Sequence, residues 1–237
     1  PLIVATFWVF ICKIPEARPS IALFKMDYAI SVLKVGTAFL WLQIIAMVVD
    51  NTNNYLITLF VGNSAVVEYQ VYNKIFNLPM TMVMLITTSL WSTITKAKAE
   101  NDWKWIRASY SKYMKIALLL GVAEFAVIVP LQWIFNFWLG DKTIPVNYGI
   151  ATIFALSGTV MSLRTILANY SNGLCELKIQ TVFMTIGAVV NIPLAYIFSR
   201  ISGSYISIVL ANIISMVPYC IAQMLWCRKY FKARAEQ

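Results

Sequence analysis

The sequence predicts an all-α fold, a polytopic transmembrane helical bundle. Of its 237 residues, 60% are hydrophobic and 12% are charged, and the mean hydropathy is +0.72. Soluble domains carry about 25% charged residues, roughly twice this fraction. Several apolar segments are long enough to cross a bilayer, which takes about 20 residues. Lysine and arginine gather in every second connection between these segments, as expected for a chain that crosses a membrane repeatedly.

Six complete spans are predicted, preceded by the tail of another helix. The spans cover residues 36–60, 65–95, 114–139, 145–173, 178–199 and 204–227. Pro79 is expected to kink the second span, because proline lacks the N–H that continues a helical hydrogen-bond ladder.

The segments outside the spans are interpreted as membrane-surface structure. Residues 1–35 would hold the end of a truncated span, a cytoplasmic loop and an interfacial helix, since the opening PLIVATFWVFIC is too short to span a bilayer. Residues 36–230 would form the six-span bundle and residues 231–237 a basic cytoplasmic tail. Residues 96–115 mix six basic residues with tryptophan and tyrosine, which favours an interfacial helix over a nucleic-acid surface.

The basic residues predict the orientation. Of the 19 lysines and arginines, 15 fall before the first span, after the sixth, or in and at the edges of the connections after the second and fourth spans. Lys142 and Arg200 fall on the other side, and Lys74 and Arg164 lie within spans. By the positive-inside rule the C-terminus is cytoplasmic.

Several classes of function are excluded by what the sequence lacks. There are no histidines, so a His-containing metal site or a Ser-His or Cys-His nucleophile is impossible. There is no glycine-rich phosphate loop, which argues against an ATP-driven pump. There is also no pair of carboxylates at acid/base spacing. We expect no enzyme activity, no cofactor, no metal and no nucleic-acid partner, and we interpret the four cysteines as packing thiols.

A hairpin over residues 48–79 carries polar side chains at membrane depth. Asp50, Asn51, Asn53 and Asn54 interrupt an apolar segment about 37 Å long at 1.5 Å per residue. Gln70, Asn73, Lys74 and Asn77 recur at i, i+3, i+4 and i+7, which places them on one face of a helix. An ionised group at the centre of a membrane helix costs at least ~2.5 kcal/mol unless it is paired or hydrated. The hairpin therefore predicts one wall of a polar pathway in which Asp50 and Lys74 share a cavity.

Each buried polar residue has a functional and a structural interpretation. Lys74 and Arg164 could bind an anionic substrate, or could pair internally with Asp50, Glu68 or Glu124, and Arg164 could also snorkel to the surface. Asp50 and its neighbouring asparagines could bind ligand hydroxyls or a coupling ion, H⁺ or Na⁺, for which Glu124 is the second candidate. The alternative role is interhelical packing.

Asparagines on the later spans also allow both kinds of interpretation. Asn169 and Asn172 could extend the pathway or cap their helix before Gly173, whereas Asn191 and Asn212 are more typical of kinks and packing. The candidate cavity-lining set is Asp50, Asn51, Asn54, Gln70, Asn73, Lys74, Asn77, Arg164 and Asn169.

An ordered series of segments resembles one transporter family. The segments are LITLFVGNSAVVEYQVYNKIFN, SLWSTITKAKAENDWKWIR, FWLGD, NGLCELKIQ, GAVVNIPLAYIF and VLANIIS. Together they resemble the C-terminal half of bacterial Wzx-type oligosaccharide flippases. These belong to the polysaccharide transporter family, in the superfamily that also holds the MATE exporters. The resemblance implies one half of a two-bundle transporter of the bacterial inner membrane.

Such a transporter moves undecaprenyl-pyrophosphate-linked oligosaccharides for O-antigen, capsule or exopolysaccharide synthesis. The resemblance also implies work beside a polysaccharide polymerase and export machinery, and alternating access by rocking of two halves. Six spans would supply one wall of its cavity. The nearest alternative is a cation-coupled exporter of small drugs from the same superfamily, although buried bases suit amphipathic cations poorly. A membrane-embedded glycan polymerase or a scaffold subunit are the more distant alternatives.

Overall fold

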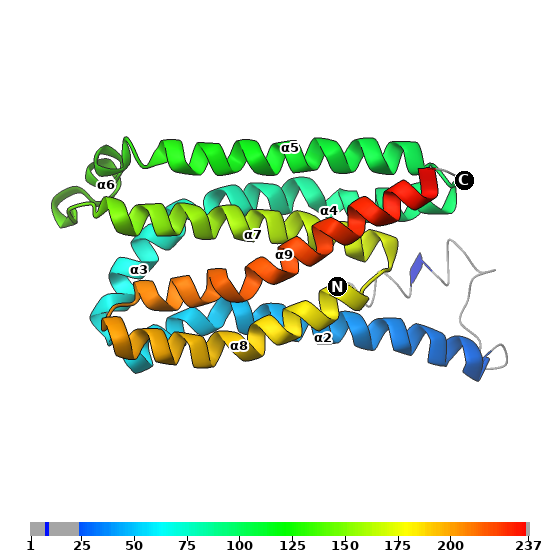
Figure 1. Ribbon diagram of the computed structural model, residues 1–237, viewed down its shortest axis with the longest axis horizontal. Coiled ribbons are helices and arrows are strands. Elements are labelled where there is room, and N and C mark those ends of the chain that lie inside the picture. Colours follow the sequence, from blue (N-terminus) through cyan, green and yellow to red (C-terminus); the bar gives the residue numbers. More distant parts are fainter. Residues whose placement is uncertain (1–7, 10–23, 236–237) are drawn as a thin grey trace. The chain divides into compact units, whose positions relative to one another are not determined.

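The computed structural model describes residues 8–9 and 24–235, and the long described stretch is helical with short connections (Figure 1). The helices are α2 (Met26–Phe60), α3 (Asn63–Phe76), α4 (Leu78–Ala99), α5 (Trp103–Val127), α6 (Leu131–Leu139), the 3₁₀ turn η4 (Gly140–Lys142), α7 (Tyr148–Leu174), α8 (Lys178–Ser202) and α9 (Ile206–Ala235). The chain divides into two units, Pro1–Leu40 and Trp41–Gln237. The border falls within α2.

The predicted fold class is confirmed. Within the described residues, five helices are long and apolar enough to cross a membrane: α2, α4, α7, α8 and α9. The pair α5 and α6 makes a sixth candidate if it counts as one broken span. The chain is therefore a polytopic helical membrane protein.

Two predicted spans are broken. The second, over 65–95, is interrupted at Asn77, so that α3 and α4 are separate helices and only α4 qualifies as a span by itself. Pro79 lies in the first turn of α4, where its missing N–H leaves the carbonyl of Ile75 without the usual helical donor. The third, over 114–139, bends by 74° between α5 and α6, at a break that contains Pro130. Both breaks lie within two residues of a proline.

The interfacial helix predicted over 96–115 is wrong. Its first residues complete α4, and after a short turn Trp103 begins α5, which runs into the bundle. The Asp102 side chain caps α5 by accepting a hydrogen bond from the backbone N–H of Trp105, at 2.9 Å. The basic residues in the first turns of α5 therefore belong to a helix of the bundle. They precede the apolar part of that helix.

The two terminal segments differ from their predicted outlines. α2 begins at Met26, ten residues before the predicted span, so most of the proposed interfacial helix is continuous with it. The proposed loop and truncated span fall largely outside the described residues. At the other end α9 remains helical to Ala235, so the basic tail begins as the last turns of a helix.

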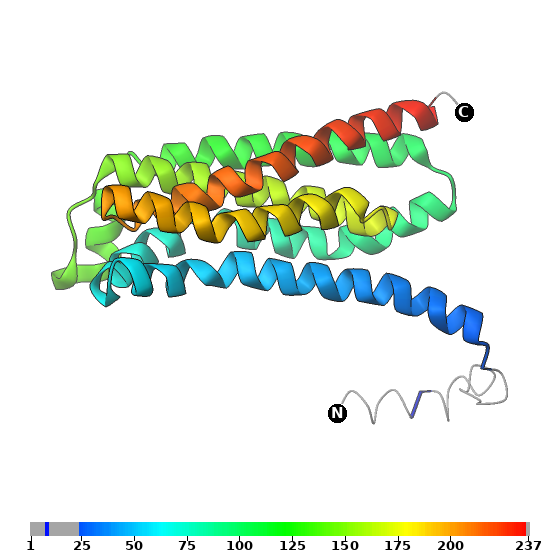
Figure 2. The ribbon, with the colours of Figure 1, turned by 60° about the horizontal axis from the view of Figure 1, so that its bottom comes forward.

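The central helix of the second unit is α7. It packs against α3, α4, α5 and α9, and 61% of its most apolar 18-residue window is buried, compared with 28% for α8. Figures 1 and 2 both show α7 lying between α5 and α9, with α8 on the far side of α9. A polar side chain that projects from α7 is therefore enclosed by neighbouring helices.

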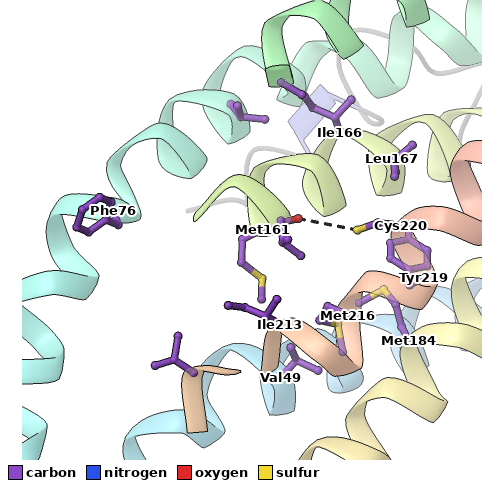
Figure 3. Packing of buried hydrophobic residues seen from close by; sticks show 14 of the residues in the cluster. Val49, Phe76, Met161, Ile166, Leu167, Met184, Ile213, Met216, Tyr219 and Cys220 are labelled. Carbon is purple, nitrogen blue, oxygen red and sulfur yellow. Dashed lines mark hydrogen bonds between the residues drawn. The ribbon is translucent and has the colours of Figure 1, made fainter. Parts of the chain in front are cut away.

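Buried apolar side chains from α2, α7, α8 and α9 form the core around this helix. Figure 3 shows Met161 of α7 beside Ile213 and Met216 of α9, with Val49 of α2 and Met184 of α8 nearby. Each of these five side chains is at most 7% exposed. Close packing of this kind fixes the relative positions of the polar groups carried on the same helices.

The two ends of the second unit differ in charge. At one end, called the basic end below, the end of α4 meets the end of α7, since Thr95 Oγ1 donates to the Gly173 carbonyl at 3.0 Å. The start of α5 meets the end of α9 there, with the rings of Trp103 and Tyr230 5.9 Å apart. Lys142 and Arg200 belong to the opposite end. The connections predicted to be basic thus meet at one end of the second unit. That this end faces the cytoplasm stays a prediction.

Candidate functional site

An ion pair between α2 and α7 joins two of the predicted site residues. Arg164 Nη2 lies 2.7 Å from Asp50 Oδ1, and the side chains are 6% and 40% exposed, respectively. Arg164 projects from the enclosed helix α7, where an unpaired guanidinium would be strongly disfavoured. It is buried, so the snorkelling alternative is wrong. Asp50 is the open member of the pair.

The local sequence explains why Asp50 faces α7. The buried positions of this part of α2 include Leu42, Ile45, Val49 and Leu56, spaced by three, four and seven residues, with Ile57 beside the last of them. Asp50 borders this face and Asn53 lies on it, one turn beyond Val49. The packing of the apolar stripe therefore carries both polar side chains against α7 and α9.

Asp50 opens into a small polar hollow, called the Asp50 hollow below. Its volume is about 120 Å³. The lining includes Asp50, Asn53, Tyr69, Asn73, Asn77, Ser157 and Asn212, together with apolar side chains. Asn77 Nδ2 donates to Asn73 Oδ1 at 2.7 Å, and Asn212 Nδ2 donates to the Val49 carbonyl at 3.2 Å and to Asn53 Oδ1 at 3.4 Å. Four carboxamides surround one neutralised carboxylate.

The polar stripe on α3 divides between two hollows. Asn73 and Asn77 face the Asp50 hollow, whereas Gln70 and Lys74 line a second, more open hollow of about 510 Å³. In the second hollow Lys74 Nζ lies 5.7 Å from the ring centroid of Trp138 at the end of α6. This is cation–π distance.

The prediction that Asp50 and Lys74 share one cavity is therefore wrong. Asn73 and Lys74 are consecutive residues and lie about 100° apart around the helix, and here they line different hollows. Lys74 makes no ion pair within the described residues, and it is exposed. Asp50 on α2 and Lys74 on α3 line separate hollows.

The other candidate residues have mainly structural contacts. Asn51 is exposed and donates to the Met47 carbonyl of its own helix at 2.9 Å. Gln70 Nε2 donates to Asn54 Oδ1 at 2.6 Å, which joins α3 to α2. Asn169 Nδ2 donates to Thr87 Oγ1 of α4 at 3.2 Å. Asn51, Asn54 and Asn169 line neither hollow.

Glu124 is buried between α5 and α7, apart from the Asp50 hollow. It is 1% exposed; Oε2 accepts a hydrogen bond from Thr159 Oγ1 at 3.2 Å, and Oε1 has no partner within the described residues. Gly158 leaves the space that it fills, because a Cβ there would meet Glu124 Oε2 and the Phe76 carbonyl. A carboxyl group with one unpartnered oxygen in such a place can hold a proton.

Some lining residues were not predicted as site residues. Asn212 was interpreted as a packing residue, but it both ties α9 to α2 and lines the Asp50 hollow. Trp138 was not predicted as a site residue, and nothing in its spacing indicated that it would meet Lys74. A polar residue in the middle of an apolar span was the available signal for Asn212.

Comparison with known proteins identifies the family. No curated protein and no solved structure matches the chain. The family model described as MatE matches residues 30–197, which is more than half of the sequence and runs from α2 into α8. This supports the superfamily that the sequence resembles, without distinguishing its subtypes. The chain belongs to the MatE family of membrane transporters.

Proposed function

We propose that this chain is part of a transporter that moves undecaprenyl-pyrophosphate-linked oligosaccharides across the bacterial inner membrane for surface polysaccharide synthesis. The observation that carries the proposal is the neutralisation of Asp50 by Arg164 at the edge of a hollow lined by carboxamides. A sugar offers many hydroxyl groups and no charge, and carboxamides both donate to and accept from hydroxyls.

The charge balance disfavours a cationic drug as the substrate. An exporter of amphipathic cations needs an uncompensated carboxylate in its path, and the carboxylate of the Asp50 hollow already has a guanidinium at 2.7 Å. At about 120 Å³ this hollow is smaller than pockets that enclose a whole ligand, so it would contact only part of an oligosaccharide.

The second hollow is suited to bind an anionic part of the substrate. Lys74 has no acidic partner within the described residues and lies against Trp138, and Gln70 lines the same hollow. An ammonium group without a counterion can contact a diphosphate or an acidic sugar, and an indole face suits a sugar ring. Lys74 would then contact the charged part of the substrate and Asp50, Asn73 and Asn77 its hydroxyls.

The coupling ion is a further part of the proposal. Glu124 is the better candidate for H⁺, because its Oε1 is buried without a partner, whereas Asp50 is held by Arg164. Partners of the transporter would include the lipid-linked oligosaccharide, membrane lipids, a polysaccharide polymerase and export machinery.

Complementation of a strain that lacks its oligosaccharide flippase tests the proposal. The full-length protein should restore surface polysaccharide and should leave sensitivity to cationic dyes unchanged. Lys74→Ala should lower the polysaccharide level at least fivefold. Lys96→Ala removes an exposed lysine outside both hollows and should leave that level within twofold. Dye resistance without polysaccharide would identify a drug exporter instead, and a normal level with Lys74→Ala would disprove the role of that residue.

A further inference from the structure

We propose that the hollows between the start of α5 and the end of α9 bind the phosphate headgroup of an anionic phospholipid. Two adjacent hollows of about 650 and 590 Å³ lie there. Figures 1 and 2 both show the C-terminal end of α9 beside the connection from α4 to α5. Arg107 and Ser111 line both hollows, so the two hollows adjoin at these side chains.

The charge of the site is uncompensated. Lys104, Arg107 and Arg234 line the first hollow, and Arg228 and Lys232 join Arg107 in the second. None of the five forms an ion pair within the described residues. The one acidic lining residue, Asp102, already caps α5 through the Trp105 N–H. Five cations around one site create a positive potential that attracts an anionic ligand.

The aromatic side chains hold this charge in place. The Arg234 guanidinium lies 4.7 Å from the ring centroid of Trp103 and 5.0 Å from that of Tyr230. Tyr110 lines the second hollow, is 7% exposed, and its hydroxyl has no hydrogen-bond partner within the described residues. A buried hydroxyl normally has a partner, and a phosphate oxygen would supply one. Stacked guanidinium groups are suited to phosphate recognition because their donors are fixed in a plane.

The position at the end of the bundle indicates a lipid as the source of the phosphate. Both helices continue from this site into apolar, membrane-spanning or bent-span segments, so a headgroup bound here keeps its acyl chains beside them. Basic pockets between transmembrane helices bind acidic headgroups in this way. The site is separate from the Asp50 and Lys74 hollows, so the proposal does not depend on the transported substrate.

Lipid titration of the full-length protein tests the assignment. The protein in neutral detergent is titrated with diphosphatidylglycerol, and the bound fraction is measured by native mass spectrometry. Arg107→Ala with Arg228→Ala should weaken binding about 30-fold, at about a factor of five to six for each basic residue. The matched control, Lys112→Ala with Lys229→Ala, removes two exposed charges from the same helices outside the site and should change binding less than threefold.

Three results would overturn the proposal. Equal losses in the two double variants would show a diffuse basic surface, and no loss in the first would show that lipid binds elsewhere. Displacement of the lipid by millimolar inorganic phosphate would identify a free-anion site. Circular dichroism of each variant separates these outcomes from unfolding, and Arg107→Lys, which keeps the charge without the planar donors, should give an intermediate affinity.

Discussion

At the scale of single residues, Asp50 and Arg164 are positioned by one another. Asp50 and Arg164 each look like a ligand-binding group when met alone in an apolar segment. In the structure they bind one another, and only Asp50 remains partly open. Lys74 lacks such a partner within the described residues and lies in a more open hollow. The pair would thus set the shape of the polar pathway, and the free ammonium would supply its charge.

Removal of Asp50 should destabilise the protein. Asp50→Ala leaves the buried Arg164 guanidinium without its counterion. The expected cost is about 2 kcal/mol, less than the 3–5 kcal/mol typical of a fully buried pair, because Asp50 is 40% exposed. Thermal unfolding in detergent, followed by fluorescence, measures the change.

Two variants control this measurement. Asn51→Ala, next in sequence and bonded only to its own helix, should change stability by less than about 0.5 kcal/mol. Asp50→Asn with Arg164→Met removes both charges and should be more stable than Asp50→Ala alone. If the double variant were the less stable of the two, the ion pair would not be the cause of the loss.

At the scale of helices, close packing around α7 depends on small residues. A Cβ at Gly158 would lie 2.5 Å from the Phe76 carbonyl and would also meet the Glu124 carboxyl. A Cβ at Gly173 would lie 2.7 Å from Ile94 Cβ on α4. Small residues at these positions let neighbouring helices approach closely, which strengthens packing inside a membrane.

Gly158→Ala should therefore separate α7 from α3 and α5. We expect a loss of about 1–3 kcal/mol in the free energy of unfolding, because the Phe76 backbone cannot move away as a flexible side chain could. Gly36→Ala is the contrasting change, since a Cβ at Gly36 in α2 meets nothing within 4 Å, and it should be neutral or stabilising by up to about 1 kcal/mol. Thermal unfolding of the two variants gives the comparison, and equal effects would contradict this account of Gly158.

The sequence predicts helices well where caps and apolar length agree. The predicted spans 145–173 and 178–199 correspond closely to α7 and α8. Asn147 caps α7 through the N–H groups of Gly149 and Ile150, and Gly203 ends α8 with a φ of 63°. The start of α5 was predicted wrongly from apolar length, because its first turns are basic. Apolar length also could not predict the 74° bend between α5 and α6.

The sequence reveals charged and amide residues inside the apolar spans, but neither their grouping nor the full set of residues that line the two hollows. A charge or an amide inside an apolar span is visible in the sequence, which is how Asp50, Arg164 and Asn73 were found. Whether Asn73 and Lys74 face one hollow or two depends on where α7, α9 and α6 pack around α3. That arrangement is tertiary, and helical spacing alone does not contain it.

At the scale of the whole molecule, the charge difference between the two ends of the second unit makes a testable statement about orientation. The basic end carries the connection from α7 to α8, and Cys175, the cap residue after α7, is exposed there. Asp141, in η4 before α7, is exposed at the opposite end. The positive-inside rule predicts that Cys175 faces the cytoplasm and Asp141 the other side.

Labelling with a membrane-impermeant maleimide decides this orientation. In a Cys12→Ser background, Cys175 should react only after the inner membrane is permeabilised. Asp141→Cys with Cys175→Ser should react at least tenfold faster than Cys175 in intact spheroplasts, because the reagent reaches that side directly. Cys220 and Cys227 are buried and should stay unlabelled in the folded protein, which makes them internal controls.

Rapid labelling of Cys175 in intact spheroplasts would reverse the predicted orientation. Labelling of both positions from outside would contradict the placement of these residues at opposite ends.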